Sequence, residues 1–209
     1  ALTTGQVQAL TTAQAAGLST TNLGALTTAQ VAAMETTDVA ALTTAQIKSL
    51  STATVAALTT TEVAALKTTQ LQALTTAQTT AMTTAQIQAL TTAQVVGLST
   101  ANVAGLSTTN VAALTTVQVG ALQTVQLNAL STAGVAALTT GQVQALTTAQ
   151  FANLSTTNLG ALTTAQVAAM ETADVAALQT AQLNALSTAS MAALTTGQVQ
   201  ALTTAQAAG

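Results

Sequence analysis

The stretch Ala25–Ala32 reads ALTTAQVA, and the whole chain is built from variants of this octad. Cut after every eighth residue from the first, the sequence gives twenty-six octads with no insertion or deletion, followed by a lone Gly209. Such strict register indicates a repeat architecture rather than a globular domain with one irregular pocket. We therefore expect one uninterrupted array over 1–209, with no internal domain boundary. Residues 193–209 are identical to 1–17, and we expect the chain to be a segment of a longer array.

The eight positions differ in how strictly they are kept. Position two is Leu except at Met34, Met82 and Met170, and position four is Thr in every octad. Position three is Ser or Thr in most octads, position six is most often Gln, and position seven is usually aliphatic. The apolar residues at positions two and seven are the candidate core.

A period of eight excludes one continuous helix. Eight residues at about 100° each overshoot two full turns by roughly 80°, so the Leu residues would wind around the helix instead of facing a core. Repeats of seven or eleven avoid this drift, whereas eight does not. The helix must be interrupted once in each octad.

The residues at the interruption form a helix start signal. Thr27 with Gln30 three residues later matches the capping box, in which each side chain bonds the backbone N–H of the other residue. Leu26 before the cap and Val31 after it match the accompanying hydrophobic staple. We therefore predict an all-α solenoid of about 26 short capped helices, one per octad. The invariant Thr28 at position four is a competing cap, and the sequence does not decide between the two threonines.

A β-solenoid is the alternative fold. Thr and Val favour strands, and three octads would make a sensible coil. Two facts count against it: internal blocks repeat at shifts of seven and seventeen octads, which are not multiples of three, and Gly is too scattered to mark corners.

Composition excludes several functions. Only 3% of residues are charged, so there is no basic surface to bind nucleic acid. The chain has no His and no Cys, so it can assemble no catalytic triad or thiolate metal site; we expect no enzyme activity and no cofactor. Thr-Thr or Ser-Thr interrupts nearly every apolar run, so we do not expect a transmembrane protein.

The few charged residues offer one weak metal hypothesis. Glu35 with Asp38, and Glu171 with Asp174, repeat the same three-residue spacing, and a carboxylate pair can contribute to a Ca²⁺ site. The simpler interpretation is that these acids lie at helix N-termini, where the dipole favours negative charge. We expect no metal site.

The threonines are the stronger functional signal. Besides capping, a regular array of Ser and Thr can carry glycans or contact a surface such as ice. The position-four residues that we single out for such contacts are Thr4, Thr28, Thr60, Thr92, Thr148 and Thr196.

Runs such as 25–32, 57–64 and 161–168 resemble the octapeptide arrays, LTTAQVAA-like, of very large secreted or surface proteins of Gram-negative bacteria, often described as adhesin-like. The resemblance covers the whole chain and implies an extracellular or cell-surface location. One octad buries too little to be stable alone, so repeats must gain stability from their neighbours. We expect a structural protein that self-associates into a fibre, stalk or biofilm-matrix filament; an ice-binding or surface-binding module is the alternative.

Overall fold

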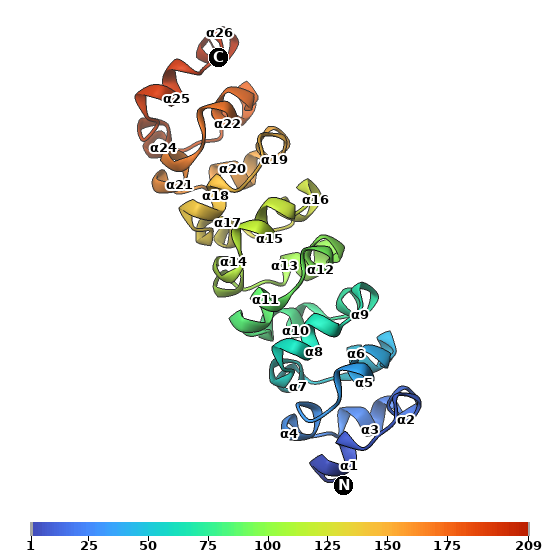
Figure 1. The fold of residues 1–209 in the computed structure, drawn as a ribbon. Helices are drawn as coiled ribbons and strands as arrows, with labels where there is room; N and C mark the ends of the chain where they lie inside the picture. The colour runs from blue at the N-terminus through green and yellow to red at the C-terminus, as the bar shows by residue number, and fades with distance from the viewer. Residues whose placement is uncertain (1, 209) are drawn as a thin grey trace. The chain divides into compact units, whose positions relative to one another are not determined.

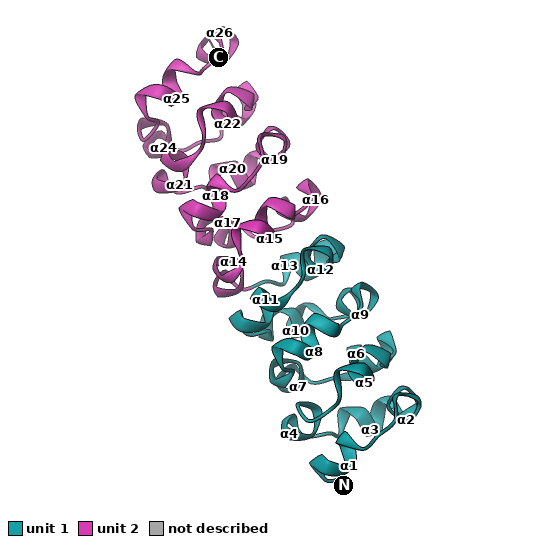
Figure 2. Cartoon of the chain, viewed as in Figure 1, with its two compact units in different colours: residues 1–106 teal, residues 107–209 magenta. Residues whose placement is uncertain are grey.

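The computed structural model describes residues 2–208, which form twenty-six short α-helices and no strand (Figure 1). The predicted all-α solenoid is thus confirmed, and the β-solenoid alternative is wrong. The chain divides into two compact units, residues 1–106 and 107–209 (Figure 2). The octad pattern crosses the boundary between them without an insertion.

Each helix has four to six residues and begins at a position-four threonine. The helices of the first unit are α1 Thr4–Gln8, α2 Thr12–Gly17, α3 Thr20–Gly24, α4 Thr28–Val31, α5 Thr36–Ala41, α6 Thr44–Ser49, α7 Thr52–Ala57, α8 Thr60–Ala65, α9 Thr68–Gln72, α10 Thr76–Ala81, α11 Thr84–Ala89, α12 Thr92–Gly97 and α13 Thr100–Ala104. Those of the second unit are α14 Thr108–Ala113, α15 Thr116–Ala121, α16 Thr124–Leu127, α17 Thr132–Ala137, α18 Thr140–Gln144, α19 Thr148–Ala152, α20 Thr156–Gly160, α21 Thr164–Ala169, α22 Thr172–Ala177, α23 Thr180–Leu183, α24 Thr188–Ala192, α25 Thr196–Gln200 and α26 Thr204–Ala208.

The residue at position three caps the helix, as the capping box predicts. At α11 the backbone N–H of Gln86 donates to Thr83 Oγ1 at 3.2 Å, and the N–H of Thr83 donates to Gln86 Oε1 at 2.8 Å. Two of the backbone donors that a helix start leaves free are thereby satisfied. The position-four threonine is the first helical residue and not the cap, which settles the choice that the sequence left open.

Two extended residues separate each six-residue helix from the next helix. After α11, Leu90 has φ −60° and ψ 130°, and Thr91, the cap of α12, has φ −68° and ψ 157°. The N–H of Leu90 donates to the carbonyl of Ile87 at 3.3 Å and closes the last turn. Among the described residues no backbone has a positive φ, so these joints need no glycine, which explains why Gly is scattered.

Positions two and seven form the core. From Val7 to Leu183 every position-seven side chain is at most 3% exposed, and from Met34 to Leu186 every position-two side chain is at most 8% exposed. Burying a Val or Leu side chain contributes roughly 1.5–3 kcal/mol. The staple predicted for each joint therefore continues along each unit as a line of buried aliphatic residues.

Helices three octads apart pack against each other. In the first unit α2 contacts α5, α5 contacts α8, and α8 contacts α11 (Figure 1). In the second unit α15 contacts α18, α18 contacts α21, and α21 contacts α24. Each turn of the solenoid thus rests on the turn before it, and no helix is stabilised by its own octad alone.

Replacing the cap Thr83 with Ala should lower the free energy of unfolding by about 1 kcal/mol, because the N–H of Gln86 loses its acceptor. Urea denaturation followed by far-UV circular dichroism measures the loss. The matched control is Thr84→Ala at the neighbouring, equally exposed first helical position, which should be neutral. An equal loss in both variants would contradict the assignment of the cap to position three.

Candidate functional site: the glutamine ladder

The most specific polar feature of the structure is a series of buried position-six amides. Gln86 is 1% exposed, and its Nε2 donates to the carbonyl of Val55 at 2.9 Å and to that of Leu58 at 2.6 Å. These carbonyls lie 31 and 28 residues earlier, at the joint of the preceding turn. We call the set of such buried amides the glutamine ladder.

The same two contacts recur in both units. Gln78 donates to Ile47 and Leu50, and Gln166 donates to Val135 and Leu138. Further ladder residues that make both contacts include Gln46, Gln70, Gln94, Gln142, Gln150, Gln182, Gln198 and Gln206.

One side chain thereby serves two helices. Its Oε1 accepts the N–H of the cap and begins its own helix, while its Nε2 satisfies carbonyls at the end of a helix one turn earlier. A buried carbonyl without a donor costs about 1–3 kcal/mol, so each amide removes a penalty that the joint would otherwise carry. An amide supplies both the acceptor and the donor that this dual contact needs, whereas an ionised carboxylate supplies acceptors only.

Shorter side chains at position six keep at least one of the hydrogen bonds to the preceding turn. Asn102 donates to the carbonyl of Leu74 at 2.9 Å, and Asn158 to that of Leu127 at 2.9 Å. The hydroxyl of Ser190 donates to the carbonyl of Leu162 at a longer 3.3 Å. The spacing of 28 or 31 residues is kept in each case.

Carboxylates occupy three ladder positions. Asp38, Glu62 and Asp174 are each 2% exposed. Burial raises the pKa of Glu62, and hydrogen bonds from Thr59 oppose the rise. Asp38 Oδ2 and Glu62 Oε1 are buried without a hydrogen-bond partner.

Asp174 differs because its carboxyl group accepts a hydrogen bond from another side chain. Thr148 Oγ1 donates to Asp174 Oδ1 at 2.8 Å, and the N–H of Glu171 donates to Oδ2 at 3.3 Å. Burial raises the pKa of Asp174, while the Thr148 hydroxyl lowers it. A position-four threonine that we expected at the surface thus contacts a buried acid 26 residues later.

The acid pairs do not assemble into a metal centre. Glu35 and Glu171 are exposed caps, while Asp38 and Asp174 are buried. Within residues 2–208, no three His, Cys, Asp or Glu side chains cluster in a way that could hold a metal ion.

The structural residues singled out in the octad at 25–32 lie together at one joint. Thr27 caps α4, Thr28 begins it, and Gln30 completes the capping box. Val31 is 1% exposed, whereas Leu26 is only partly buried.

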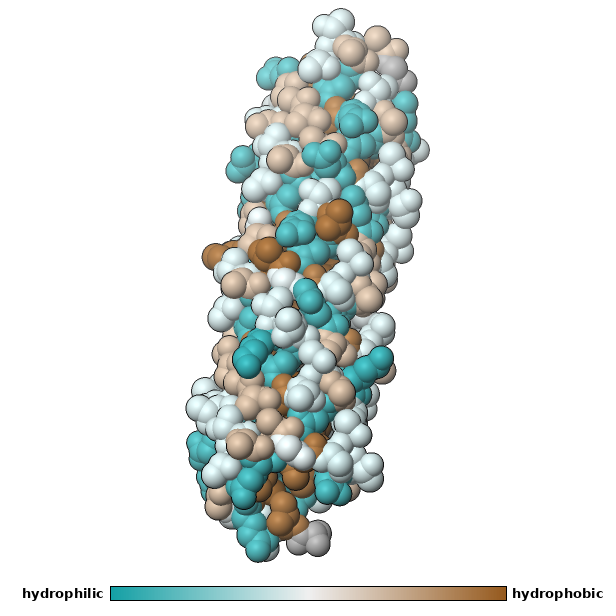
Figure 3. Space-filling view, turned by 90° about the vertical axis from the view of Figure 1, so that its right-hand side faces the viewer, coloured by the Kyte–Doolittle hydropathy of each residue, from teal (hydrophilic) through white to brown (hydrophobic). Residues whose placement is uncertain are grey.

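The threonines singled out for surface contact are exposed first residues of their helices. They are Thr4, Thr28, Thr60, Thr92, Thr148 and Thr196. On the face shown in Figure 3, hydrophilic and weakly hydropathic side chains alternate, and strongly hydrophobic residues form only small separate patches. Whether these threonines carry glycans or contact a surface stays a prediction.

Some position-four threonines also limit the size of the side chain at position one in the following turn. A Cβ placed on Gly97 would lie 2.1 Å from Thr68 Cγ2, so alanine at 97 would displace that methyl group. Beside this contact, Gln72 Nε2 donates to the Gly97 carbonyl at 2.7 Å. Thr80 Oγ1 donates to the Gly105 carbonyl over the same spacing of 25 residues.

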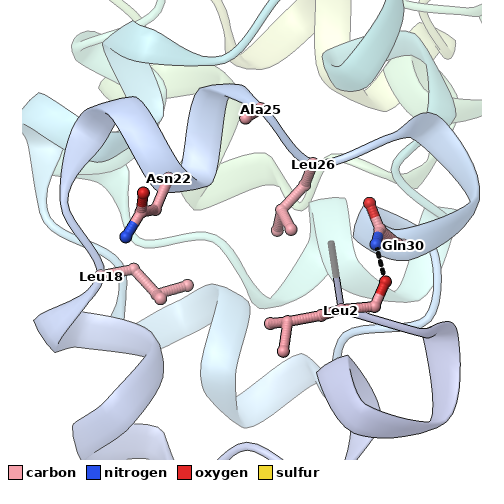
Figure 4. Close-up of a pocket in the computed structure, with 6 residues that line it drawn as sticks. All are labelled: Leu2, Leu18, Asn22, Ala25, Leu26 and Gln30. Atoms are coloured by element: carbon pink, nitrogen blue, oxygen red, sulfur yellow. Dashed lines mark hydrogen bonds between the residues drawn. The ribbon is translucent and has the colours of Figure 1, made fainter.

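A cavity of about 360 Å³ lies beside the first turns (Figure 4). It is lined mainly by the apolar side chains of Leu2, Leu18 and Leu26, with Asn22 at its edge. The other lining amide, Gln30, is already bonded to the carbonyl of Leu2. This cavity is part of the Leu seam and offers few polar groups to orient a ligand.

The sequence predicted the hydrogen bond that the position-six Oε1 accepts from the cap. It did not predict the hydrogen bonds that Nε2 donates to the preceding turn. The signal was present: a capping box accepts Glu as readily as Gln, yet Glu occupies position six only at Glu62. A preference for the amide over the acid means that the NH₂ group is also used.

Gln142→Leu should lower the free energy of unfolding by about 2 kcal/mol, because the carbonyl of Leu114 loses its donor and the N–H of Thr139 loses its acceptor. Gln144→Leu, at an exposed position of the same helix α18, is the matched control and should be close to neutral. Chemical denaturation of both variants makes the comparison. Equal stability of the two would contradict the ladder.

Thr148→Val should destabilise the chain by about 1 kcal/mol at a pH where Asp174 is ionised, because the carboxylate loses a hydroxyl donor. The bond favours the ionised acid, so its contribution is present above the pKa of Asp174 and is lost as the pH falls through it. Thr12→Val is the control, since Thr12 lies 26 residues before Asp38, whose Oδ2 has no partner. A Thr148→Val effect independent of pH, measured by denaturation from about pH 3 to pH 7, would contradict the assignment.

A protein-family model described as ALTTAQ repeat matches seven overlapping segments, residues 1–36, 31–68, 61–92, 89–124, 117–148, 143–170 and 167–204. No curated protein and no solved structure matches the chain. Among the described residues, none of the helices has both the length and the apolar character needed to cross a bilayer.

Proposed function

The chain belongs to the ALTTAQ repeat family, and we propose that it is a structural protein that self-associates, turn upon turn, into an extracellular fibre, stalk or matrix filament. The observation that carries this proposal is the uniformity of the contact between turns. Each ladder amide recognises two backbone carbonyls and no particular side chain. Because every turn offers these groups, a turn of one chain is chemically equivalent to a turn of another.

The last turn shows which side chains contact between turns would cover. Position-seven side chains are buried through Leu183, whereas Met191 is 36% and Val199 is 51% exposed. No later turn of the described residues covers them. A following turn, from a longer chain or from a second copy, would bury both side chains by the contact that the array uses internally.

The surface chemistry favours packing between copies. The net charge of −3 over 209 residues gives little repulsion between chains. The bacterial and extracellular part of the proposal comes from the resemblance to adhesin-like octapeptide arrays.

The test is electron microscopy and sedimentation of the purified chain over a range of concentrations. We expect filaments or elongated oligomers that grow with concentration. Val199→Glu should suppress them, because a charge at position seven cannot be buried against a second copy without a partner. Gln200→Glu introduces the same charge at the neighbouring exposed position and should leave association intact.

A chain that stays monomeric at every concentration, or that associates equally in both variants, would contradict turn-upon-turn association. Measuring thermal hysteresis on the same samples addresses the alternative function. A monomer with hysteresis that is lost when exposed threonines such as Thr60 and Thr92 are replaced by Val would favour a surface-binding module instead.

A further inference from the structure

Glu62 occupies a ladder position, where the side chain must both accept and donate hydrogen bonds. An ionised carboxylate can only accept them. Its Oε2 accepts the N–H of Thr59 at 2.5 Å, as the Oε1 of a glutamine does at the same position. Its second oxygen, Oε1, is buried without a partner, and the residue is 2% exposed. The half of the side chain that caps α8 is therefore satisfied, and the half that faces the preceding turn is not.

The repeat geometry identifies the groups that Glu62 Oε1 faces. In α11, one turn later, the Nε2 of Gln86 occupies this place and donates to carbonyls 31 and 28 residues earlier. Counting back from Glu62 by the same spacings gives the carbonyls of Val31 and Met34. A carboxylate oxygen at this place would meet two further acceptors with no hydrogen between them. A protonated carboxyl group has the shape of an amide and can donate as the glutamine does.

We propose that the Glu62 carboxyl group binds a proton in the folded array and donates a hydrogen bond to the carbonyl of Val31 or Met34. The contact between α8 and the joint that connects α4 to α5 then depends on pH. The proton replaces one of the two hydrogen atoms that glutamine supplies. When the proton leaves, the joint loses its donor and gains a buried charge next to carbonyl oxygens.

Neither helix packed against α8 carries a basic residue that could pair with an ionised Glu62. Two acids belong to helix α5 and its cap: the exposed cap residue Glu35 and the buried Asp38 within the helix. Helix α11 carries no charged residue, and the nearby Lys67 at the cap of α9 is exposed. A negative charge on Glu62 would thus add to an acidic neighbourhood.

The direction of the pKa agrees with this geometry. Burial raises the pKa of Glu62 above its ordinary value of 4.5, against the opposing hydrogen bonds from Thr59. An acid whose folded pKa is raised stabilises the fold fully below its unfolded pKa, and the contribution is lost as the pH rises through the folded value. Glu62 should therefore support the array in acid and weaken it near neutrality.

The test compares the native chain with Glu62→Gln by urea denaturation between about pH 4 and pH 8. We expect the two to be similarly stable at the acid end. Towards the upper end the unfolding equilibrium of the native chain should shift by more than about tenfold relative to Glu62→Gln, because the folded state then holds a buried charge. Glu35→Gln removes an exposed acid from the neighbouring helix α5 and should show a smaller pH-dependent difference.

Infrared difference spectra supply a readout separate from stability. The native spectrum minus that of Glu62→Gln should contain the C=O stretch of a protonated carboxyl group at a pH where exposed acids are ionised. Absence of that band, or a stability difference that does not change with pH, would overturn the proposal. Recovery of stability at the upper pH by added Ca²⁺ or K⁺ would also overturn it, since a cation and not a proton would then neutralise Glu62.

Discussion

The contact on which the whole array depends is the position-six amide placed between two helices. Isolated helices of four to six residues are unstable in water, because a nucleus costs more than so few hydrogen bonds return. In this chain Gln86 begins α11 with its Oε1 and satisfies the joint after α7 with its Nε2. Formation of one helix is thereby coupled to the end of another, one turn away.

This coupling gives a physical reason for the strict register of the sequence. The ladder requires spacings of 28 and 31 residues between donor and acceptor. Duplicating whole octads preserves both spacings, whereas inserting one residue would misplace every amide whose contact spans the insertion. Shortening the side chain is tolerated better, as Asn102 shows by keeping one of the two bonds. An array of this kind can therefore grow by blocks and vary at single residues without losing its fold.

The same constraint shapes what the molecule can do. The polar groups that are buried and held by hydrogen bonds are used for contact between turns. The exposed side chains are mainly threonines, other uncharged polar residues and alanines, with a few charged and larger apolar residues. This exposed surface repeats with the octad. The feature that distinguishes one turn from another is the occasional acid in the ladder. Glu62 lacks a donor, whereas Asp174 obtains one from Thr148.

The sequence by itself determined much of the local structure: one helix per octad, a capping-box signal at each helix start, and the staple of position-two and position-seven residues. These features depend on atoms at most a few residues apart, so capping chemistry and helical periodicity were sufficient to predict them. The sequence left open which of two threonines caps each helix, and the structure assigned the cap to position three, as at Thr83. The tertiary structure alone decided which octads meet, and therefore that Gln86 reaches Val55, that Thr148 reaches Asp174 and that Glu62 is buried beside the preceding turn. The reason is that the angle between successive short helices sets the number of octads in a turn, and small angular changes at each joint accumulate over three octads before the chain meets itself again.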